Sequence, residues 1–359
     1  MRIRRNYWWV AVAVLVIAGG IITAILLRKR AAPDAVRLLP ECDAVLYINL
    51  EPIRLLTDLG KSTPKEREPQ YEDFVRETGF EFERDLDKAA FAIHYGVVIA
   101  GKAAPETRYS EILQGHFDSA RVSTYLRKVA SGSEAYQGYE IYMIPVEDRT
   151  VRVALLGVDI AAASNMESAD TIHGMIDRYR QSALPFTGPS LITQYYARVP
   201  LGSIVWTVAR PPASSKHGGH DELLLPGEWS GLLPPASVVV ASARPLNDVR
   251  LRAEVIARDD AQAQNFTQQV NAYLTVFKSL EISMDSGGPD KDVKEAFDSI
   301  EVHQEKNEAV LTAKVPFGFF KKMLSAPPVE FAPEPPKAEE QRPPSTPPAK
   351  SKSPHAKHR

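Results

Sequence analysis

The chain has 359 residues, with 43 lysines and arginines against 45 aspartates and glutamates, a formal net charge of −2. The charges are unevenly distributed, because residues 38–340 hold 31 basic and 44 acidic residues, a balance of −13, whereas both ends are basic. An acidic body lacks the basic face that neutralises phosphates, so the composition argues against nucleic-acid binding. The single cysteine, Cys42, excludes an intramolecular disulfide.

Residues 1–30 predict a transmembrane anchor with basic flanks. The 21 residues from Tyr7 to Leu27 carry no charge, and as a helix they would extend roughly 31 Å, the thickness of a bilayer hydrocarbon core. Trp8 and Trp9 stand at the front edge, where amphipathic rings favour the headgroup layer. A cleavable signal peptide is the alternative, but its apolar region is about 7–15 residues long and ends at a small-residue cleavage site.

The orientation of this anchor is not decided by charge. Three arginines precede the apolar segment and three basic residues follow it, so the positive-inside comparison is nearly even. A short basic head followed by one apolar segment is the usual layout of a signal anchor. We therefore expect a single-pass protein of the inner (cytoplasmic) membrane, with its main domain in the periplasm.

Residues 31–210 predict a first lobe in which strands alternate with amphipathic helices. Residues 44–50, 91–100, 109–117, 139–144, 151–157, 159–164 and 203–210 are rich in β-forming residues. Asp118 can cap a helix over 119–130, in which Val122 and Leu126 belong to one apolar stripe. A second helix begins near Ser168, and residues 190–198 also favour a helix.

Residues 211–235 contain five prolines and four glycines, which predicts a junction between lobes. A second lobe, 236–325, resumes the pattern with strands at 237–243 and 249–258, a helix capped by Asp259 or Asp260, a short helix near 290–299, a hairpin over 301–315 and a terminal helix at 318–324. Residues 326–359 are rich in proline and end in basic residues, so we expect a disordered tail.

The expected fold class is α+β. The two lobes would each be a mixed, mostly antiparallel sheet with helices on one face. A strand that runs into Asp118 and a helix in the first lobe, and another that runs into Asp259 and a helix in the second, suggest a distant internal repeat.

Four segments carry a resemblance to a known group: GHFD (115–118), AYQGYEIY (135–142), MIDRYR (175–180) and GSIVWTVAR (202–210). They resemble uncharacterised bacterial proteins with an N-terminal membrane anchor and an extracytoplasmic α+β domain. The resemblance implies the fold and the location, and it implies no activity or cofactor.

Catalytic motifs are absent from the sequence: there is no GxSxG, no GxxxxGK[ST], no HExxH and no CxxC. One weak candidate for a metal site is the cluster His217, His220 and Asp221. It lies in the Gly/Pro-rich junction without rigid support and lacks an evident fourth ligand, so we expect no metal and no cofactor.

Two functions fit these observations. The first is a non-enzymatic binding or structural module in the envelope, whose partners are the membrane and another envelope protein or the cell wall. The alternative is a small-molecule or lipid-binding domain with a cleft between the lobes near 211–235, which could include a hydrolase. An apolar pocket with convergent polar groups would favour the alternative.

Overall fold

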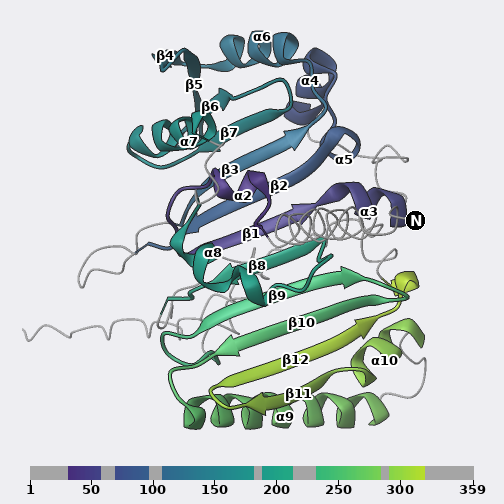
Figure 1. The fold of residues 1–359 in the computed structure, drawn as a ribbon. Helices are drawn as coiled ribbons and strands as arrows, with labels where there is room; N and C mark the ends of the chain where they lie inside the picture. The colour runs from purple at the N-terminus through teal and green to yellow at the C-terminus, as the bar shows by residue number, and fades with distance from the viewer. Residues whose placement is uncertain are drawn as a thin grey trace, which may run out of the picture. The chain divides into compact units, whose positions relative to one another are not determined.

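The structure is a computed structural model that describes residues 31–57, 69–96, 107–181, 188–212, 232–283 and 291–319. All of them belong to one unit of the chain, Met1–Leu324. The strands form a single 12-stranded sheet in the order β11-β12-β10-β9-β8-β1-β2-β3-β7-β6-β5-β4 (Figure 1). The expected α+β class is confirmed.

The strands have these bounds: β1 Ala44–Asn49, β2 Leu86–His94, β3 Arg108–Gly115, β4 Gly132–Tyr136, β5 Tyr139–Val146, β6 Arg149–Leu155, β7 Ile160–Ser164, β8 Val205–Ala209, β9 Val238–Pro245, β10 Val249–Ile256, β11 Glu301–Glu305 and β12 Glu308–Val315. Every neighbouring pair among them is antiparallel, so the expectation of a mixed sheet is wrong for the described strands. Short turns enforce this direction for β4–β5, β5–β6, β6–β7, β9–β10 and β11–β12, since a parallel neighbour needs a crossover of a dozen or more residues.

The helices are α2 Asp34–Arg37, α3 Leu50–Leu56, α4 Pro69–Thr78, α5 Phe82–Asp85, α6 Ser119–Val129, α7 Asp170–Arg180, α8 Ser190–Tyr195, the 3-10 turn η1 Tyr196–Arg198, α9 Asp260–Ser283 and α10 Lys291–Asp298. Two of them confirm their expected caps. Asp118 Oδ1 accepts hydrogen bonds from the amides of Ala120 and Arg121 at the start of α6, and Asp259 Oδ1 accepts one from Gln262 near the start of α9.

Helices cover both faces of the sheet, so the expectation of helices on one face is wrong. We call one face the α7 face: on it, Val45, Ala154 and Trp206 pack with α2, α7 and α8. On the other, the α6 face, Val153 contacts α6 and Val255 contacts Phe266 of α9. Successive residues of a strand point to opposite faces, and strands with apolar residues at successive positions need cover on both sides.

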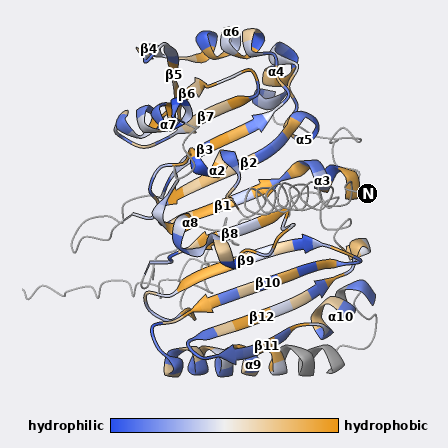
Figure 2. Cartoon of the chain, viewed as in Figure 1, coloured by the Kyte–Doolittle hydropathy of each residue, from blue (hydrophilic) through white to orange (hydrophobic). Residues whose placement is uncertain are grey.

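Hydropathy follows this layering. Apolar residues run along the central strands, while α6 and α7 carry both polar and apolar residues (Figure 2). The apolar stripe of α7 is confirmed, because Ile172, Met175 and Ile176 are fully buried against the sheet. Trp206, an expected core residue, is 2% exposed.

The sheet is continuous across the two expected lobes. β8 precedes the predicted junction and β9 follows it, and the two strands pair directly from Val205↔Ala243 to Ala209↔Val239. β1 and β8 also pair, at the centre of the strand order. Residues 213–231, which hold most of the junction and the region of the expected cleft, lie outside the described residues.

The two halves share one order of strands when counted outward from the centre. β1, β2, β3, β7 and β6 follow one another on one side, and β8, β9, β10, β12 and β11 on the other. In each half the third strand leads into a helix on the α6 face, α6 or α9, and a later strand then pairs with that third strand. The hairpin of β4 and β5 has no counterpart among the described strands of the second half.

Several boundaries differ from the expected ones. β2 begins at Leu86 and ends at His94, whereas the sequence favoured 91–100. Residue 50 begins α3 instead of ending a strand, and neither α4 nor β4 was expected. Asp87 and Lys88 near the start of β2 are charged and interrupt its apolar pattern. The sequence therefore did not predict that the strand begins at Leu86.

In the described part of the chain no helix is both long and apolar enough to span a membrane. The predicted anchor, with Tyr7, Trp8, Trp9 and Leu27, lies outside that part, as does the expected tail.

Candidate functional site

His217, His220 and Asp221 lie outside the described residues, so the weak metal candidate stays a prediction. Within the described ranges, no cluster of three or more His, Cys, Asp or Glu side chains could hold a metal ion. Other side chains in these ranges that could perform chemistry or binding are described below by their contacts.

Cys42 is not presented as a nucleophile. It packs against the main core beside the start of β1. Burial raises the pKa of its thiol to about 12, and the charges of Asp43 and Glu41 act in the same direction. Only the thiolate is nucleophilic, so this thiol is unreactive near neutral pH.

A histidine and a glutamate come together where α7 meets the edge strand β4. His173 Nε2 lies 2.5 Å from Glu134 Oε1, and the imidazole stacks on the ring of Tyr136 with a centroid distance of 3.9 Å. Tyr136 in turn donates a hydrogen bond to Asp177. Each group is bonded between the helix and the strand, so the cluster attaches α7 to the edge of the sheet.

Arg198, in η1, bridges two carboxylates of the second half of the sheet. Its guanidinium donates to Glu308 at 2.7 and 2.8 Å and to Glu254 at 3.2 Å. Arg252 donates to the other oxygen of Glu254, which is buried on the α7 face. This network holds η1, which follows the first-half helices, against strands β10 and β12.

This network predicts an acid-dependent loss of stability. Hydrogen bonding by Arg198 lowers the pKa of Glu308, so the folded chain holds this proton less tightly than the unfolded chain. The contribution is therefore complete above the ordinary carboxyl pKa and is lost as the pH falls through the lower folded-state pKa. In Glu308→Gln we expect the free energy of unfolding to fall less steeply between about pH 5 and about pH 3. Equal slopes for the variant and the parent in denaturant titrations would contradict this.

The strongest candidate for a binding surface is aromatic and lies on α4 and α5. The ring of Phe82 is within 5.7 Å, centroid to centroid, of Tyr71, Phe74 and Phe80. Phe74 contacts Tyr125 of α6 at 5.3 Å, and Phe80 contacts Phe117 at 5.9 Å. Phe80 is 7% exposed whereas Phe82 is 37% exposed. The rings thus form a base of buried and half-buried side chains with Phe82 at the surface, which we call the aromatic platform.

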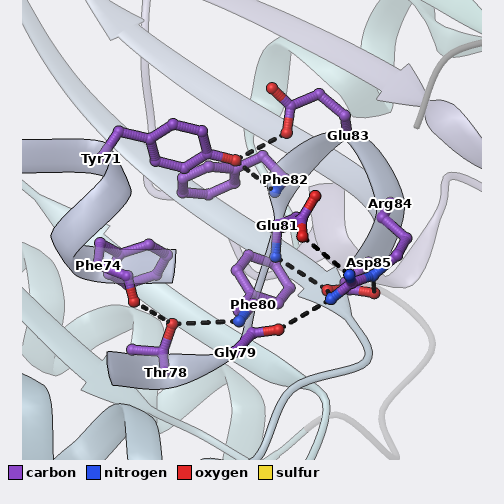
Figure 3. Close-up of polar contacts among 10 residues, drawn as sticks. All are labelled: Tyr71, Phe74, Thr78, Gly79, Phe80, Glu81, Phe82, Glu83, Arg84 and Asp85. Atoms are coloured by element: carbon purple, nitrogen blue, oxygen red, sulfur yellow. Dashed lines mark hydrogen bonds and ion pairs between the residues drawn. The ribbon is translucent and has the colours of Figure 1, made fainter. Parts of the chain in front are cut away.

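Side chains of α4 fix the backbone that carries this platform (Figure 3). The hydroxyl of Tyr71 accepts a hydrogen bond from the Phe82 amide at 3.0 Å and donates one to Glu83 at 2.7 Å. The hydroxyl of Thr78 accepts one from the Phe80 amide at 3.2 Å. The backbone amides of Phe80 and Phe82 are therefore both held by hydroxyl groups of α4.

The turn between α4 and α5 is fixed as well. Gly79 has a φ of +74°, the left-handed conformation with which many helices end. Arg84 donates to the Gly79 carbonyl at 2.9 Å and forms ion pairs with Glu81 and Asp85 (Figure 3). From α6, Arg121 donates to the carbonyl of Glu77 at 2.8 Å, which satisfies the free end of α4. The surface around Phe82 is therefore preorganised.

The sequence contained a signal for this surface that the strand and helix patterns did not reveal. Four aromatic residues, Tyr71, Phe74, Phe80 and Phe82, occur within twelve positions. The spacing of Tyr71 and Phe74 is that of one helix face. The glycine between the second and third aromatic residues marks the turn that brings the pairs together.

Comparison with known proteins adds no family. No protein-family model matches the chain, and no curated protein matches its sequence. Among solved structures, crystal form III of TP0453 aligns with 82% of this chain and 98% of its own, at 12% identity and a TM-score of 0.45. Crystal forms I and IV of TP0453 align at 12% identity with TM-scores of 0.40 and 0.38, over 82% and 83% of this chain and 98% and 99% of theirs. Values this low support no statement about function.

Proposed function

We propose that this chain is a membrane-anchored envelope protein whose domain is a non-enzymatic binding module, and that its aromatic platform binds another envelope protein. The observation that carries the proposal is the exposed ring of Phe82 on a base of fixed aromatic rings. Residues that dominate protein interfaces are enriched in aromatic side chains and arginine, and a preorganised surface loses little entropy on binding. Arg84, 48% exposed in its side chain, lies on the same short helix, α5, as Phe82.

The paired state of the reactive groups supports a role without catalysis. Cys42 is partly buried with a raised thiol pKa, and His173 and Glu134 bond to each other between α7 and β4. Arg198 is held by two glutamates. These groups stabilise contacts between elements, which is the ordinary use of such side chains in a structural or binding domain.

The test is site-specific photocrosslinking in intact cells. A photoreactive phenylalanine at position 82 should crosslink to a discrete protein partner. The matched control is Tyr273 on α9, an aromatic residue that is 50% exposed and has no ring partner among the described residues. We expect Phe82→Ser to weaken partner binding about 30-fold, the effect of losing a hot-spot aromatic residue. Equal crosslinking at positions 82 and 273, or unchanged binding by Phe82→Ser, would contradict the proposal.

We infer the membrane topology from the sequence. Residues 7–27 would span the inner membrane once, and residues 31–325 would form the periplasmic domain, followed by the tail from 326 to 359. Protease added after the outer layer is opened should digest the domain and leave a cytoplasmic control intact. A domain that resists protease until the inner membrane is lysed would reverse the orientation.

We also infer that the halves before and after 211–235 are distant copies of one plan. The shared order of their strands, with α6 and α9 at equivalent positions, supports this. In this interpretation the two copies meet edge to edge through β1 and β8 and build one sheet instead of two lobes.

A further inference from the structure

Exposed apolar side chains gather at one end of the sheet. This end holds the last residues of β1, β3 and β9 and the first residues of β2, β8 and β10, as their pairing registers require. In Figure 1 it is the side where α3, α5 and α10 lie. Of the ten large apolar residues exposed in the described part of the chain, six lie in turns or helices at this end: Leu55, Phe82, Val158, Leu201, Leu246 and Phe297.

A row of cations lies beside two of these residues. On the α7 face, Arg244 of β9, Arg250 of β10 and Lys314 of β12 are direct neighbours across three strands. Arg250 pairs with Asp248 at 3.3 Å, whereas within the described residues no ion pair involves Arg244 or Lys314. Like charges directly opposite each other destabilise a sheet. A row of three therefore favours an anionic ligand that neutralises it.

The cation row and the apolar residues form one surface. Leu246, 49% exposed, follows Arg244 by two positions, in the turn between β9 and β10. Leu201, 53% exposed, precedes Gly202, and a Cβ added at Gly202 would lie 3.8 Å from Arg244 Cδ. Exposed leucines flanked by cations suit the boundary of a bilayer, where apolar groups enter the acyl region and cations contact lipid phosphates.

We propose that this end of the sheet rests on an anionic lipid surface, with Leu201 and Leu246 in the interface and Arg244, Arg250 and Lys314 on the phosphates. The inference rests on the proposed function in one respect, because the predicted anchor places the domain beside a membrane. That anchor ends at Leu27, and Ala32 already packs against the core on the α7 face, the face of the cation row. The five residue steps from Leu27 to Ala32 span at most about 18 Å.

The test is lipid-quenched fluorescence of the full-length protein in proteoliposomes. Leu246→Cys is labelled with an environment-sensitive fluorophore, and Val146→Cys is the matched control, since Val146 is 47% exposed at the opposite end of the sheet. Labelled parent protein gives the background, which should be low because Cys42 is partly buried and its thiol pKa is raised. Phosphatidylglycerol with brominated acyl chains should quench the label at 246 at least about twofold more than the label at 146, and more than brominated phosphatidylcholine does. Arg244→Gln with Lys314→Gln should reduce the difference.

Each other outcome overturns a defined claim. Flotation of the vesicles in a density gradient shows whether the protein is membrane-bound. If the protein floats and the labels at 246 and 146 are quenched equally, the lipid contact is overturned and the anchor remains supported. Protein that does not float contradicts the anchor instead. Quenching at 246 that ignores lipid charge and the Arg244 and Lys314 substitutions overturns the role of the cation row. A label that is unquenched in vesicles but shifts its emission in native membranes would assign this end to an acidic protein and overturn the lipid proposal.

Discussion

Replacing Trp206 with alanine should lower the free energy of unfolding by about 3–5 kcal/mol, the cost of removing a large buried aromatic side chain. Trp206 is 2% exposed on β8, and its ring lies 5.4 Å from Tyr47 of β1 and 5.2 Å from Tyr196 of η1. Its loss would leave a cavity where the two central strands meet the helix layer. Denaturant titration of the full-length protein in mild detergent, followed by circular dichroism, measures the effect.

Two controls separate the cavity from general damage. Trp206→Phe retains most of the ring contacts and should cost clearly less than the alanine variant. Tyr273→Ala removes an exposed aromatic residue and should change stability by no more than about 0.5 kcal/mol. A Trp206→Ala variant as stable as Tyr273→Ala would show that packing of Trp206 against Tyr47 and Tyr196 does not stabilise the fold.

Removing the charge of Arg198 should have the next largest effect. Breaking a buried ion pair by deleting one partner costs about 3–5 kcal/mol, and because Arg198 is partly exposed and Arg252 still contacts Glu254, we expect about 2 kcal/mol for Arg198→Met. The matched control is Arg76→Met, which breaks the exposed pair with Asp73 and should cost at most about 0.5 kcal/mol. Losses of equal size in the two variants would refute the structural role of the network.

A double substitution sharpens this test. Adding Glu308→Gln to Arg198→Met removes a carboxylate that would otherwise stand without its main partner. The double variant should therefore lose less stability than the sum of the two single variants. Additive losses would mean that Arg198 acts through packing and not through Glu308.

The sequence predicted much of the secondary structure because local patterns determined it. The capping residue Asp118 predicted the start of α6, and the apolar stripe of Ile172, Met175 and Ile176 predicted α7. The number of sheets and their faces could not be predicted in this way. Pairing of β1 with β8 depends on contacts between residues more than 150 positions apart, which no local period records.

The candidate site was less predictable than the fold. The expected site residues, from Tyr7 to Leu27 and from His217 to Asp221, stand in segments of unusual composition, which composition analysis detects readily. Four aromatic residues cluster between Tyr71 and Phe82, but sequence alone does not show that they form one platform. That arrangement depends on the hydrogen bonds of Tyr71 and Thr78 and on Gly79, which turns the chain back. The cation row likewise exists only through the registers of β9, β10 and β12.

The pairing of β1 with β8 also limits when the sheet can be completed during synthesis of the chain. Thr207 donates a hydrogen bond to the carbonyl of Val45, 162 residues earlier, so β1 has one open edge until the middle of the chain has been made. Synthesis proceeds at about 5–20 residues per second, which leaves this edge without β8 for roughly 8–30 s. An apolar strand edge exposed for so long is prone to aggregation, so the risk of misassembly is greatest before residue 209 has been made.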